Sequence, residues 1–184
     1  MNTLSHKAGL RAAMRRQRRA IAAAAPEAAA ALAAQADALP TRRVVALYRA
    51  MGSELDPAAL ALALSRQGRQ LCLPVVVDRA APLIFRRWSP GDPLAPDAAG
   101  CPAPTTAAPV VTPDLILTPL LAFDGAGGRL GQGGGYYDRT FAALPEAIRI
   151  GLAFAGQEIA AVPMASHDQR LDGVLTESGY RAFP

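Results

Sequence analysis

The stretch GRLGQGGGYYDRTF, from Gly128 to Phe141, is the part of the chain whose residue types and spacing best suit chemistry. Five glycines precede or separate an arginine, two adjacent tyrosines and an acid–base pair. Glycines let successive backbone N–H groups converge on an anion, because no Cβ blocks positive φ or close approach. A helix beginning at the tyrosines would add partial positive charge at its N-terminus. The pattern favours a phosphate or ring site over its alternative, a flexible surface loop.

The common nucleotide and hydrolase motifs do not occur in this chain. A P-loop requires Gly-Lys followed by Ser or Thr, and the one lysine is Lys7. The dinucleotide motif GxGxxG fails because Tyr136 stands where its last glycine should be. Neither GxSxG nor HExxH is present, and the histidines are His6 and His167. The sequence therefore contains no recognisable nucleophile triad.

Positive charge is concentrated at the N-terminus. Residues 1–19 carry six basic residues and no acid, so the net charge of +4 arises from this segment. This distribution predicts an anion partner at the N-terminal segment and not a protein that is basic throughout. Lys7 and Arg11 lie at i and i+4, on one face of a predicted helix, and can reach the same polyphosphate. The alternative is a solvated basic face, to which we assign Arg15, Arg16, Arg18 and Arg19.

The elements that must position these residues alternate between helix and strand. Residues 4–39 predict two helices broken at Pro26, with this proline at the start of the second. The apolar runs VVALYRAM and LCLPVVV have strand length. Between them lies a predicted helix with Asp56 as its N-cap and Gly68 as its stop. This β-α-β unit predicts parallel neighbouring strands.

Further strands are predicted in PLIFRRW, at an edge, and in DLILTPLLAF, IRIGLAF and DGVLTE, with a helix through YYDRTFAAL. Residues 89–113 contain so many prolines that we expect a long surface connection without regular structure. The order predicts one domain, residues 1–184, folded as an open three-layer α/β/α sandwich with a mainly parallel sheet. Ligands of such sheets bind beyond the carboxyl ends of the strands.

Composition narrows the class of protein. The chain has 184 residues, 51% of them hydrophobic, which suits one globular domain. No apolar run is long enough to cross a bilayer. The two cysteines have no CxxC spacing, so we expect neither a disulfide scaffold nor a zinc site, and a cytoplasmic location. An arginine-rich start can also be a transit peptide, but here it continues into an alanine-rich helix containing Glu27 and Asp37.

The glycine-rich stretch closely resembles the signature of the 5-formyltetrahydrofolate cyclo-ligase family. The resemblance extends over nearly the whole chain, through KAGLR, YRAMGSELD, GCPAP, DLILTPLLAFD and VPMASHDQRLDGVLTE. The chain departs from the family pattern at Ala165, where a glutamate is usual, and at Gln132, where a larger basic or aromatic residue is often found. RLGQGGGYYDR is the specific part of the match, whereas KxxLR alone would be weak.

The resemblance implies an activity: ATP and Mg²⁺ convert 5-formyltetrahydrofolate to 5,10-methenyltetrahydrofolate, with release of ADP and phosphate. It implies small-molecule substrates only, without nucleic acid or membrane, and we expect a monomer. It also implies roles for residues. The ATP-binding set is Lys7, Arg11, Arg129, Leu130, Gly131, Gln132, Gly133, Gly134, Gly135, Tyr136 and Tyr137; the substrate-binding set is Arg49, Glu54, Gln132, Gly133, Gly134, Gly135 and Tyr136; the magnesium ligands are Asp138 and Asp168.

Each acidic candidate has an ordinary alternative. Glu54 could be a charge near a helix N-terminus, and Asp138 a charge in a helix's first turn. Asp168 could be a cap, and His167 a neutral core or surface histidine.

Two rival functions remain at this stage: a non-catalytic α/β domain that binds a phosphorylated metabolite, and a nucleic-acid binder that uses the basic N-terminus. The second would lack aromatic side chains among its arginines.

Overall fold

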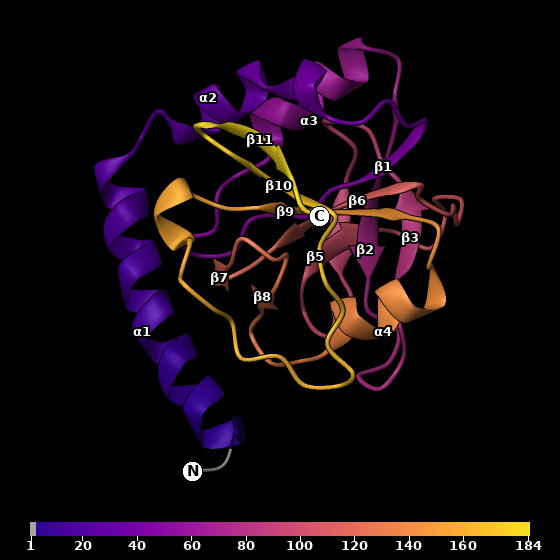
Figure 1. Ribbon diagram of the computed structural model, residues 1–184. Coiled ribbons are helices and arrows are strands. Elements are labelled where there is room, and N and C mark those ends of the chain that lie inside the picture. Colours follow the sequence, from indigo (N-terminus) through magenta and orange to yellow (C-terminus); the bar gives the residue numbers. More distant parts are fainter. Residues whose placement is uncertain (1–2) are drawn as a thin grey trace.

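A seven-stranded sheet with the order β11-β10-β9-β6-β1-β2-β3 forms the middle layer of the computed structural model, which describes residues 3–184 (Figure 1). The helices are α1 (Thr3–Ala24), α2 (Ala28–Ala34), the 3₁₀ helix η1 (Ala36–Ala38), α3 (Ala58–Arg66), α4 (Tyr136–Ala143) and the 3₁₀ helix η2 (Ala155–Gln157). The sheet strands are β1 (Val44–Ala46), β2 (Gln70–Val75), β3 (Ile84–Arg87), β6 (Leu115–Pro119), β9 (Ile148–Leu152), β10 (Gly173–Thr176) and β11 (Gly179–Ala182). Two hairpins stand apart from it, β4 (Leu94–Pro96) with β5 (Pro102–Pro104), and β7 (Ala122–Phe123) with β8 (Arg129–Leu130).

The sheet is mainly parallel, as the sequence predicts. Strands β2, β1, β6, β9 and β10 pair in parallel, and β3 and β11 add antiparallel edges. The β-α-β prediction is confirmed, because β1 lies beside β2 with Val45 opposite Leu71. The strand predicted at an edge, β3, is an edge strand.

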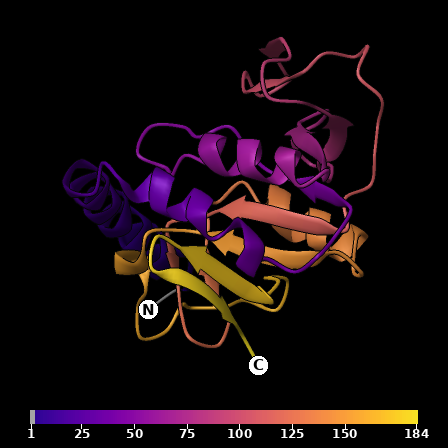
Figure 2. The ribbon, with the colours of Figure 1, turned by 90° about the horizontal axis from the view of Figure 1, so that it is seen from above.

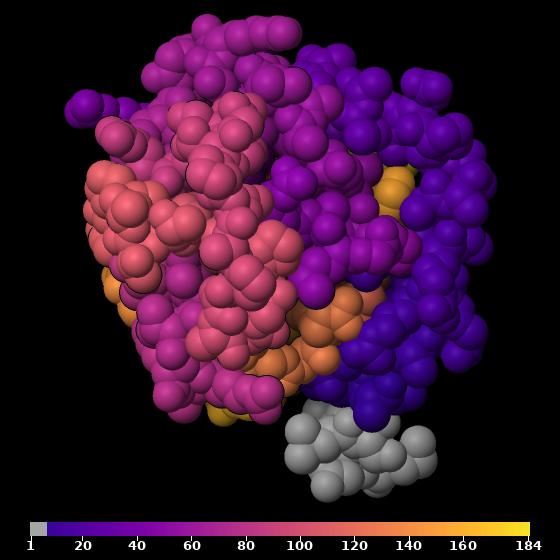
Figure 3. Space-filling model, turned by 180° about the vertical axis from the view of Figure 1, so that it is seen from behind, coloured from indigo at the N-terminus to yellow at the C-terminus, as the bar shows by residue number. Residues whose placement is uncertain are grey.

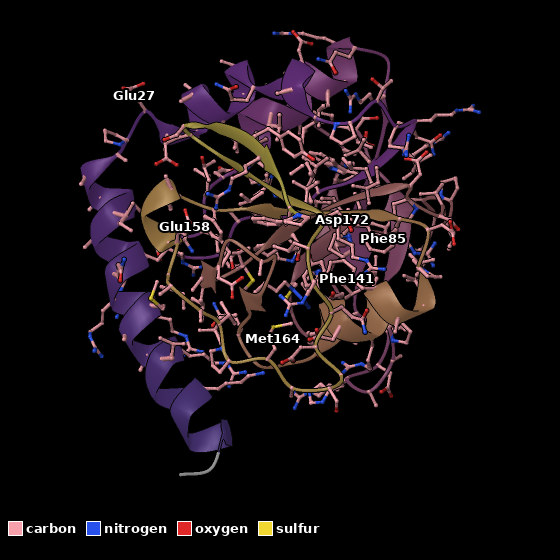
Figure 4. The ribbon with its side chains drawn as sticks, viewed as in Figure 1. Glu27, Phe85, Phe141, Glu158, Met164 and Asp172 are labelled. Carbon is pink, nitrogen blue, oxygen red and sulfur yellow. The ribbon has the colours of Figure 1, made fainter. Side chains whose placement is uncertain are left out.

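The two faces of the sheet carry separate cores because successive strand residues point to opposite sides. Val45 and Leu71 pack in the cluster that contains Leu60 of α3, whereas Ala46 packs in the cluster that contains Phe141 of α4. Helices α2 and α3 therefore cover one face and α4 the other (Figure 1). Phe85 and Phe141, labelled in Figure 4, both belong to the α4 side. This is the three-layer arrangement that the sequence predicts.

Helix α1 lies beside the β7–β8 hairpin (Figure 1). Met14 is buried in a cluster with Leu121, Ala122 and Leu130 of the hairpin. This apolar contact fixes the position of α1 relative to the segment that follows β8. Among the described residues, no helix is both long enough and apolar enough to span a membrane.

The second helix and the connection over residues 89–113 differ from the sequence-based expectations. The second helix begins at Ala28, not at Pro26, because Ala28 N–H closes a turn on Ala25 O and the first helical hydrogen bond runs from Ala31 to Glu27. The expectation of an irregular connection over residues 89–113 is wrong in part, since it contains the β4–β5 hairpin. Each strand of that hairpin pairs with one neighbour only. Its prolines, which have no backbone N–H, are tolerated because no second strand requires a donor from them.

Figure 2 shows this connecting segment extending away from the sheet layers. Strand β11 and the β7–β8 hairpin were not predicted either. Both are short, and β7 and β8 contain two residues each, which is too few to produce a recognisable alternation.

Candidate active site

One cavity of about 690 Å³ opens at the carboxyl ends of the strands, between α1, the segment after β1, the β4–β5 hairpin and the glycine loop. Figure 3 shows a hollow here, with orange surface at its base between indigo α1 and the pink segment near residue 100. The cavity brings together every residue that the sequence singled out for ligand binding: Lys7, Arg11, Arg49, Glu54, Arg129, Leu130, Gly131, Gln132, Gly133, Gly134, Gly135, Tyr136, Tyr137, Asp138 and Asp168.

The glycine loop, residues 131–135, connects β8 to α4. Gly133 and Gly135 have φ of 105° and 68°, which side chains other than glycine rarely adopt. A Cβ on Gly133 would lie 3.2 Å from the guanidinium carbon of Arg11. Gly135 occupies the N-cap position of α4, so the helix begins at Tyr136, in the cavity wall. The loop therefore presents backbone and a helix N-terminus to the cavity.

The two tyrosines after the loop anchor it. Both pack against the core on the α4 side of the sheet, and Tyr137 lies 5.9 Å from Phe141 between ring centroids. The Arg139 guanidinium lies 5.2 Å from the Tyr136 ring centroid. Burial raises the pKa of Tyr137 well above its ordinary value, so this phenol stays neutral. The flexible-loop alternative fits poorly with this packing.

Four cationic residues of α1 recur at spacings of four, four and three, Lys7, Arg11, Arg15 and Arg18, and the first two line the cavity. We call the four residues the cationic stripe. Arg11 Nε donates to Gly131 O at 3.0 Å, and Arg15 Nε donates to Gln132 Oε1 at 2.9 Å. The helix thus holds the glycine loop from the side. The assignment of Arg18 to a solvated face is wrong, because Arg18 is buried against other segments, whereas Arg15, Arg16 and Arg19 are exposed.

Arg18 is the clearest residue that sequence reasoning missed. Its side chain is buried, and its Nε donates to Ser53 Oγ at 3.2 Å while Nη1 donates to Leu120 O at 3.2 Å. Nη1 also lies 3.6 Å from Glu54 Oε1. Burial lowers the pKa of Arg18, and the nearby Glu54 opposes that shift. The signal that could have found it is the continuation of the Lys7–Arg11 spacing along the helix.

Glu54 has a contact within its own segment and also lies in the cavity wall. Its carboxylate stabilises its own turn, because Oε2 accepts a hydrogen bond from Met51 N–H at 3.0 Å. It also lines the cavity with its side chain 10% exposed. Burial raises the pKa of Glu54, and the Met51 N–H and the Arg18 guanidinium oppose this rise. A carboxylate in this position can accept hydrogen bonds from a ligand's N–H donors. Arg49, from the same segment, is exposed and also lines the cavity.

Asp168 is bound from both sides. Its Oδ2 accepts hydrogen bonds from the ammonium of Lys7 and from Ala165 N–H. Burial would raise the pKa of Asp168, but the Ala165 N–H and the Lys7 ammonium lower it on balance. The support from Ala165 comes from its backbone, so the replacement of the family's glutamate leaves this contact intact. His167 is exposed, with Nε2 3.7 Å from Asp168 Oδ1.

Asp138 is held by Arg129. Arg129 Nη2 donates to Asp138 Oδ1 at 2.9 Å, and Gln169 N–H donates to the same oxygen at 3.0 Å. Arg129 Nη1 donates in turn to Gln169 O at 2.8 Å, and its guanidinium lies 4.8 Å from the Phe141 ring centroid. Burial lowers the pKa of Arg129, while Asp138 opposes that change. Asp138 and the segment after Asp168 are thus locked together.

The carboxylates of the cavity suit a magnesium site that phosphate and water complete better than a site made of protein ligands alone. Among residues 3–184 whose side chains are described, no group of three or more His, Cys, Asp or Glu residues converges. Mg²⁺ commonly takes only one or two carboxylates, with water and phosphate oxygens completing its shell. The described hydrogen bonds to Asp138 all fall on Oδ1 and those to Asp168 on Oδ2, which leaves one oxygen of each carboxylate for a cation.

The β4–β5 hairpin supplies a wall for which the sequence assigned no residues. Asp97, Ala99, Cys101 and Pro102 line the cavity. Asp97 orders this wall by accepting hydrogen bonds from the N–H groups of Ala99 and Cys101, and from Val76 of the core. The GCPAP segment carried a signal for this wall only through its resemblance to the family.

Comparison with known proteins shows the family of this chain. The model of the 5-formyltetrahydrofolate cyclo-ligase family matches residues 3–177. The 5-formyltetrahydrofolate cyclo-ligase of Haemophilus influenzae is 34% identical over 138 residues, which cover 71% of this chain and 74% of that protein. The Escherichia coli K12 protein of the same name is 33% identical over 141 residues, covering 73% and 78%.

Solved structures resemble this chain over most of its length. The NMR structure of Aquifex aeolicus 5,10-methenyltetrahydrofolate synthetase has a TM-score of 0.76 and 26% identity, and the match covers 94% of this chain and 92% of that one. The Mycoplasma pneumoniae 5,10-methenyltetrahydrofolate synthetase, at 22% identity and a TM-score of 0.73, shares the fold over 93% of this chain and 98% of its own. The family match over nearly the whole chain establishes that this protein belongs to the 5-formyltetrahydrofolate cyclo-ligase family.

Proposed function

We propose that this protein converts 5-formyltetrahydrofolate to 5,10-methenyltetrahydrofolate with ATP and Mg²⁺, releasing ADP and phosphate. Family membership supports the reaction. The observation that carries the proposal for this chain is the convergence of a glycine loop, the cations Lys7 and Arg11, and the carboxylates of Glu54, Asp138 and Asp168 in one cavity. Those groups suit a polyphosphate, a metal ion and a ring with N–H donors, which is the set of ligands that the reaction requires.

The chemistry explains why no nucleophilic side chain is needed. A formyl amide oxygen is a poor leaving group, so the second nitrogen cannot displace it directly. Transfer of the γ-phosphoryl group breaks its bond to ADP and forms a bond to the formyl oxygen, giving an imidate phosphate. The neighbouring nitrogen then attacks the formyl carbon and loses its proton, and the carbon–oxygen bond breaks to release phosphate. Catalysis rests on alignment and on neutralising phosphate charge.

The phosphate half of the cavity is assigned to the glycine loop and α1. Backbone N–H groups of residues 131–135 and the N-terminus of α4 would bind phosphate oxygens. Lys7 and Arg11 would add charge from the side. The proposed ATP-binding set is the one implied by the family: Lys7, Arg11, Arg129, Leu130, Gly131, Gln132, Gly133, Gly134, Gly135, Tyr136 and Tyr137.

The folate half is assigned to the segment after β1 and the wall that the β4–β5 hairpin supplies. Glu54 would accept hydrogen bonds from the amino and ring N–H donors of the pterin. Arg49 would contact the same substrate from the exposed side. The glycine loop from Gln132 to Tyr136 lies between the two halves and would contact both substrates, which suits transfer of a phosphoryl group from one to the other.

Asp138 and Asp168 would hold magnesium. When bound, the ion neutralises charge on the phosphate oxygens. Arg129 orients Asp138, and the Ala165 N–H orients Asp168, so both carboxylates are placed before a ligand arrives. We expect the protein to act on small molecules as a cytoplasmic monomer, without nucleic acid.

The proposal is tested by mixing purified protein with ATP, Mg²⁺ and 5-formyltetrahydrofolate and following methenyltetrahydrofolate absorbance together with ADP release. We expect one ADP per product molecule and no signal when any component is omitted. ADP release that is independent of the folate would contradict the proposal. Binding of ATP or of folate without any turnover would instead identify a non-catalytic binding domain.

A further inference from the structure

Arg18 is a buried cation that the proposed reaction does not use directly. Its side chain is 6% exposed, and Arg18 is not among the residues that line the cavity. Its guanidinium contacts two segments that follow neighbouring parallel strands: Ser53 and Glu54 after β1, and Leu120 after β6. Burying a guanidinium costs free energy unless its donors are paired. The burial of Arg18 therefore requires an explanation other than the solubility of the protein.

Glu54 supplies that reason, because its carboxylate is also removed from water. Among the side chains that the structure describes, Arg18 is the one cation within 4 Å of this carboxylate. The other titratable groups around it are Tyr48 from the same segment, Cys101 from the β4–β5 hairpin and Tyr137 from α4. Burial raises the pKa of each of these three groups, which keeps them neutral. Besides the Met51 N–H, Arg18 is therefore the partner that favours a negative charge on Glu54, and it is the cationic one.

The geometry leaves Glu54 oxygens for a ligand. Met51 N–H donates to Oε2, while Arg18 Nη1 stands 3.6 Å from Oε1, farther than a hydrogen bond of normal length. Arg18 satisfies its own donors on Ser53 and Leu120 instead. It thus contributes charge and a fixed position without occupying the acceptor sites of the carboxylate.

We propose that Arg18 is a positioning residue for the folate substrate: it acts through Glu54, keeping that carboxylate ionised and directed into the cavity to meet the pterin N–H donors. The inference rests on the proposed function, and specifically on folate as the ligand of Glu54. Arg18 also fixes the distance between the ends of β1 and β6, since Leu120, which accepts its hydrogen bond, lines the same cavity.

The test compares three variants, with Arg16→Gln as the control. Arg16 is an exposed arginine of the same helix. In Arg18→Gln we expect the KM for 5-formyltetrahydrofolate to rise by about ten-fold or more, because the positive charge beside Glu54 is lost, with the KM for ATP changed by less than about two-fold. Arg18→Lys should recover most of the folate affinity, because it keeps the charge. Arg16→Gln should behave as wild type.

A pH profile separates this role from a purely structural one. If Arg18 stabilises the ionised carboxylate, the pH below which folate binding is lost should move upward in Arg18→Gln, measured by calorimetry. The effects of Arg18→Gln and Glu54→Gln on folate affinity should also be strongly non-additive. An unchanged pH profile, additive effects, or equal effects on both substrates would overturn the inference.

If Arg18→Gln does not fold, judged by circular dichroism, Arg18→Lys carries the test. It keeps the charge, so its folate affinity and pH profile should stay near those of wild type, and a large loss of folate affinity in the folded Arg18→Lys protein would overturn the inference. Wild-type protein that fails to bind 5-formyltetrahydrofolate would overturn the proposed function and this inference together. Wild-type binding with an unaltered Arg18→Gln variant would overturn the inference alone.

Discussion

Lys7 of α1 donates a hydrogen bond from its ammonium to Asp168 Oδ2, joining two side chains that are 161 positions apart. Both are largely removed from solvent, with side-chain exposures of 9% and 12%. In the proposed reaction the ammonium binds phosphate and the carboxylate binds magnesium. Without these ligands, the two groups compensate each other. In this proposal, binding of Mg²⁺ and ATP would exchange one internal ion pair for two contacts with the ligands.

This exchange makes a prediction for Lys7 and Arg11. Lys7→Ala and Arg11→Ala should each raise the KM for ATP by about ten-fold or more, since each removes a charged contact to phosphate. The KM for the folate should change far less. Steady-state kinetics with each substrate varied in turn gives both constants, and Arg19→Ala, an exposed position on the same helix, serves as the control. Equal changes for both substrates would remove these residues from the ATP site.

The carboxylates make a second prediction. Asp138→Asn should abolish turnover at ordinary Mg²⁺ concentration, with partial recovery at high Mg²⁺ or with Mn²⁺, because an amide is a weaker ligand than a carboxylate. Asp168→Asn should act in the same direction but more mildly. Metal titrations of the initial rate measure both effects. Glu146→Gln, an exposed acid, is the control, and normal metal dependence in an aspartate variant would exclude that aspartate from the site.

Glu54 makes a third prediction. Glu54→Gln should weaken folate binding by about ten-fold or more, because a charged acceptor for N–H donors is lost. ATP binding should stay close to normal, since the contacts of Glu54 all lie in the segment after β1 and at Arg18. Calorimetric titration with each ligand separates the two. Unchanged folate affinity would leave Glu54 with only its role in the turn at Met51.

The glycine loop makes a fourth prediction. Gly133→Ala should be strained by about 1–2 kcal/mol at a φ of 105°, and its Cβ would displace the Arg11 guanidinium. We therefore expect a higher KM for ATP together with a lower melting temperature. Gly125→Ala, where a Cβ would meet its nearest neighbour only at 4.0 Å, should leave both values near those of wild type. Normal ATP affinity in Gly133→Ala would show that the loop tolerates a different backbone path.

Asp124 predicts how stability depends on pH. This buried carboxylate accepts hydrogen bonds from the N–H groups of Ala126, Gly128 and Val162. Burial would raise the pKa of Asp124, but the three donors lower it on balance. The folded pKa is therefore below the unfolded one, so the stabilisation is complete above the unfolded value and is lost as the pH falls through the folded one.

Denaturant unfolding should measure this contribution. Asp124→Asn should lower the free energy of unfolding at pH 7 by about 1–3 kcal/mol, with a smaller deficit below about pH 4. Asp78→Asn, an exposed residue with one local backbone hydrogen bond, is the matched control. A deficit that is independent of pH would mean that Asp124 acts through packing and not through its charge.

The sequence by itself determined the order of the main elements and singled out part of the cavity lining, above all the glycine loop. Strands such as β6 and β9 are recognisable because burial on both faces requires a continuous apolar run, as in Leu115–Pro119. The glycine loop was recognisable because positive φ at Gly133 and Gly135 restricts the residue type at those positions. These are local requirements, and each leaves its signal within a few residues.

Only the tertiary structure decided which charges meet. The helical spacing places Arg18 on the face of Lys7 and Arg11, but it does not show that Arg18, unlike Arg16 and Arg19, is buried against segments 35 and 102 positions away. The Lys7–Asp168 pair and the β4–β5 wall depend in the same way on how α1 and the hairpin pack against the strand ends. Such contacts follow from the chain's path in three dimensions, and a charge on a helix has the same local sequence whether it meets solvent or a buried carboxylate.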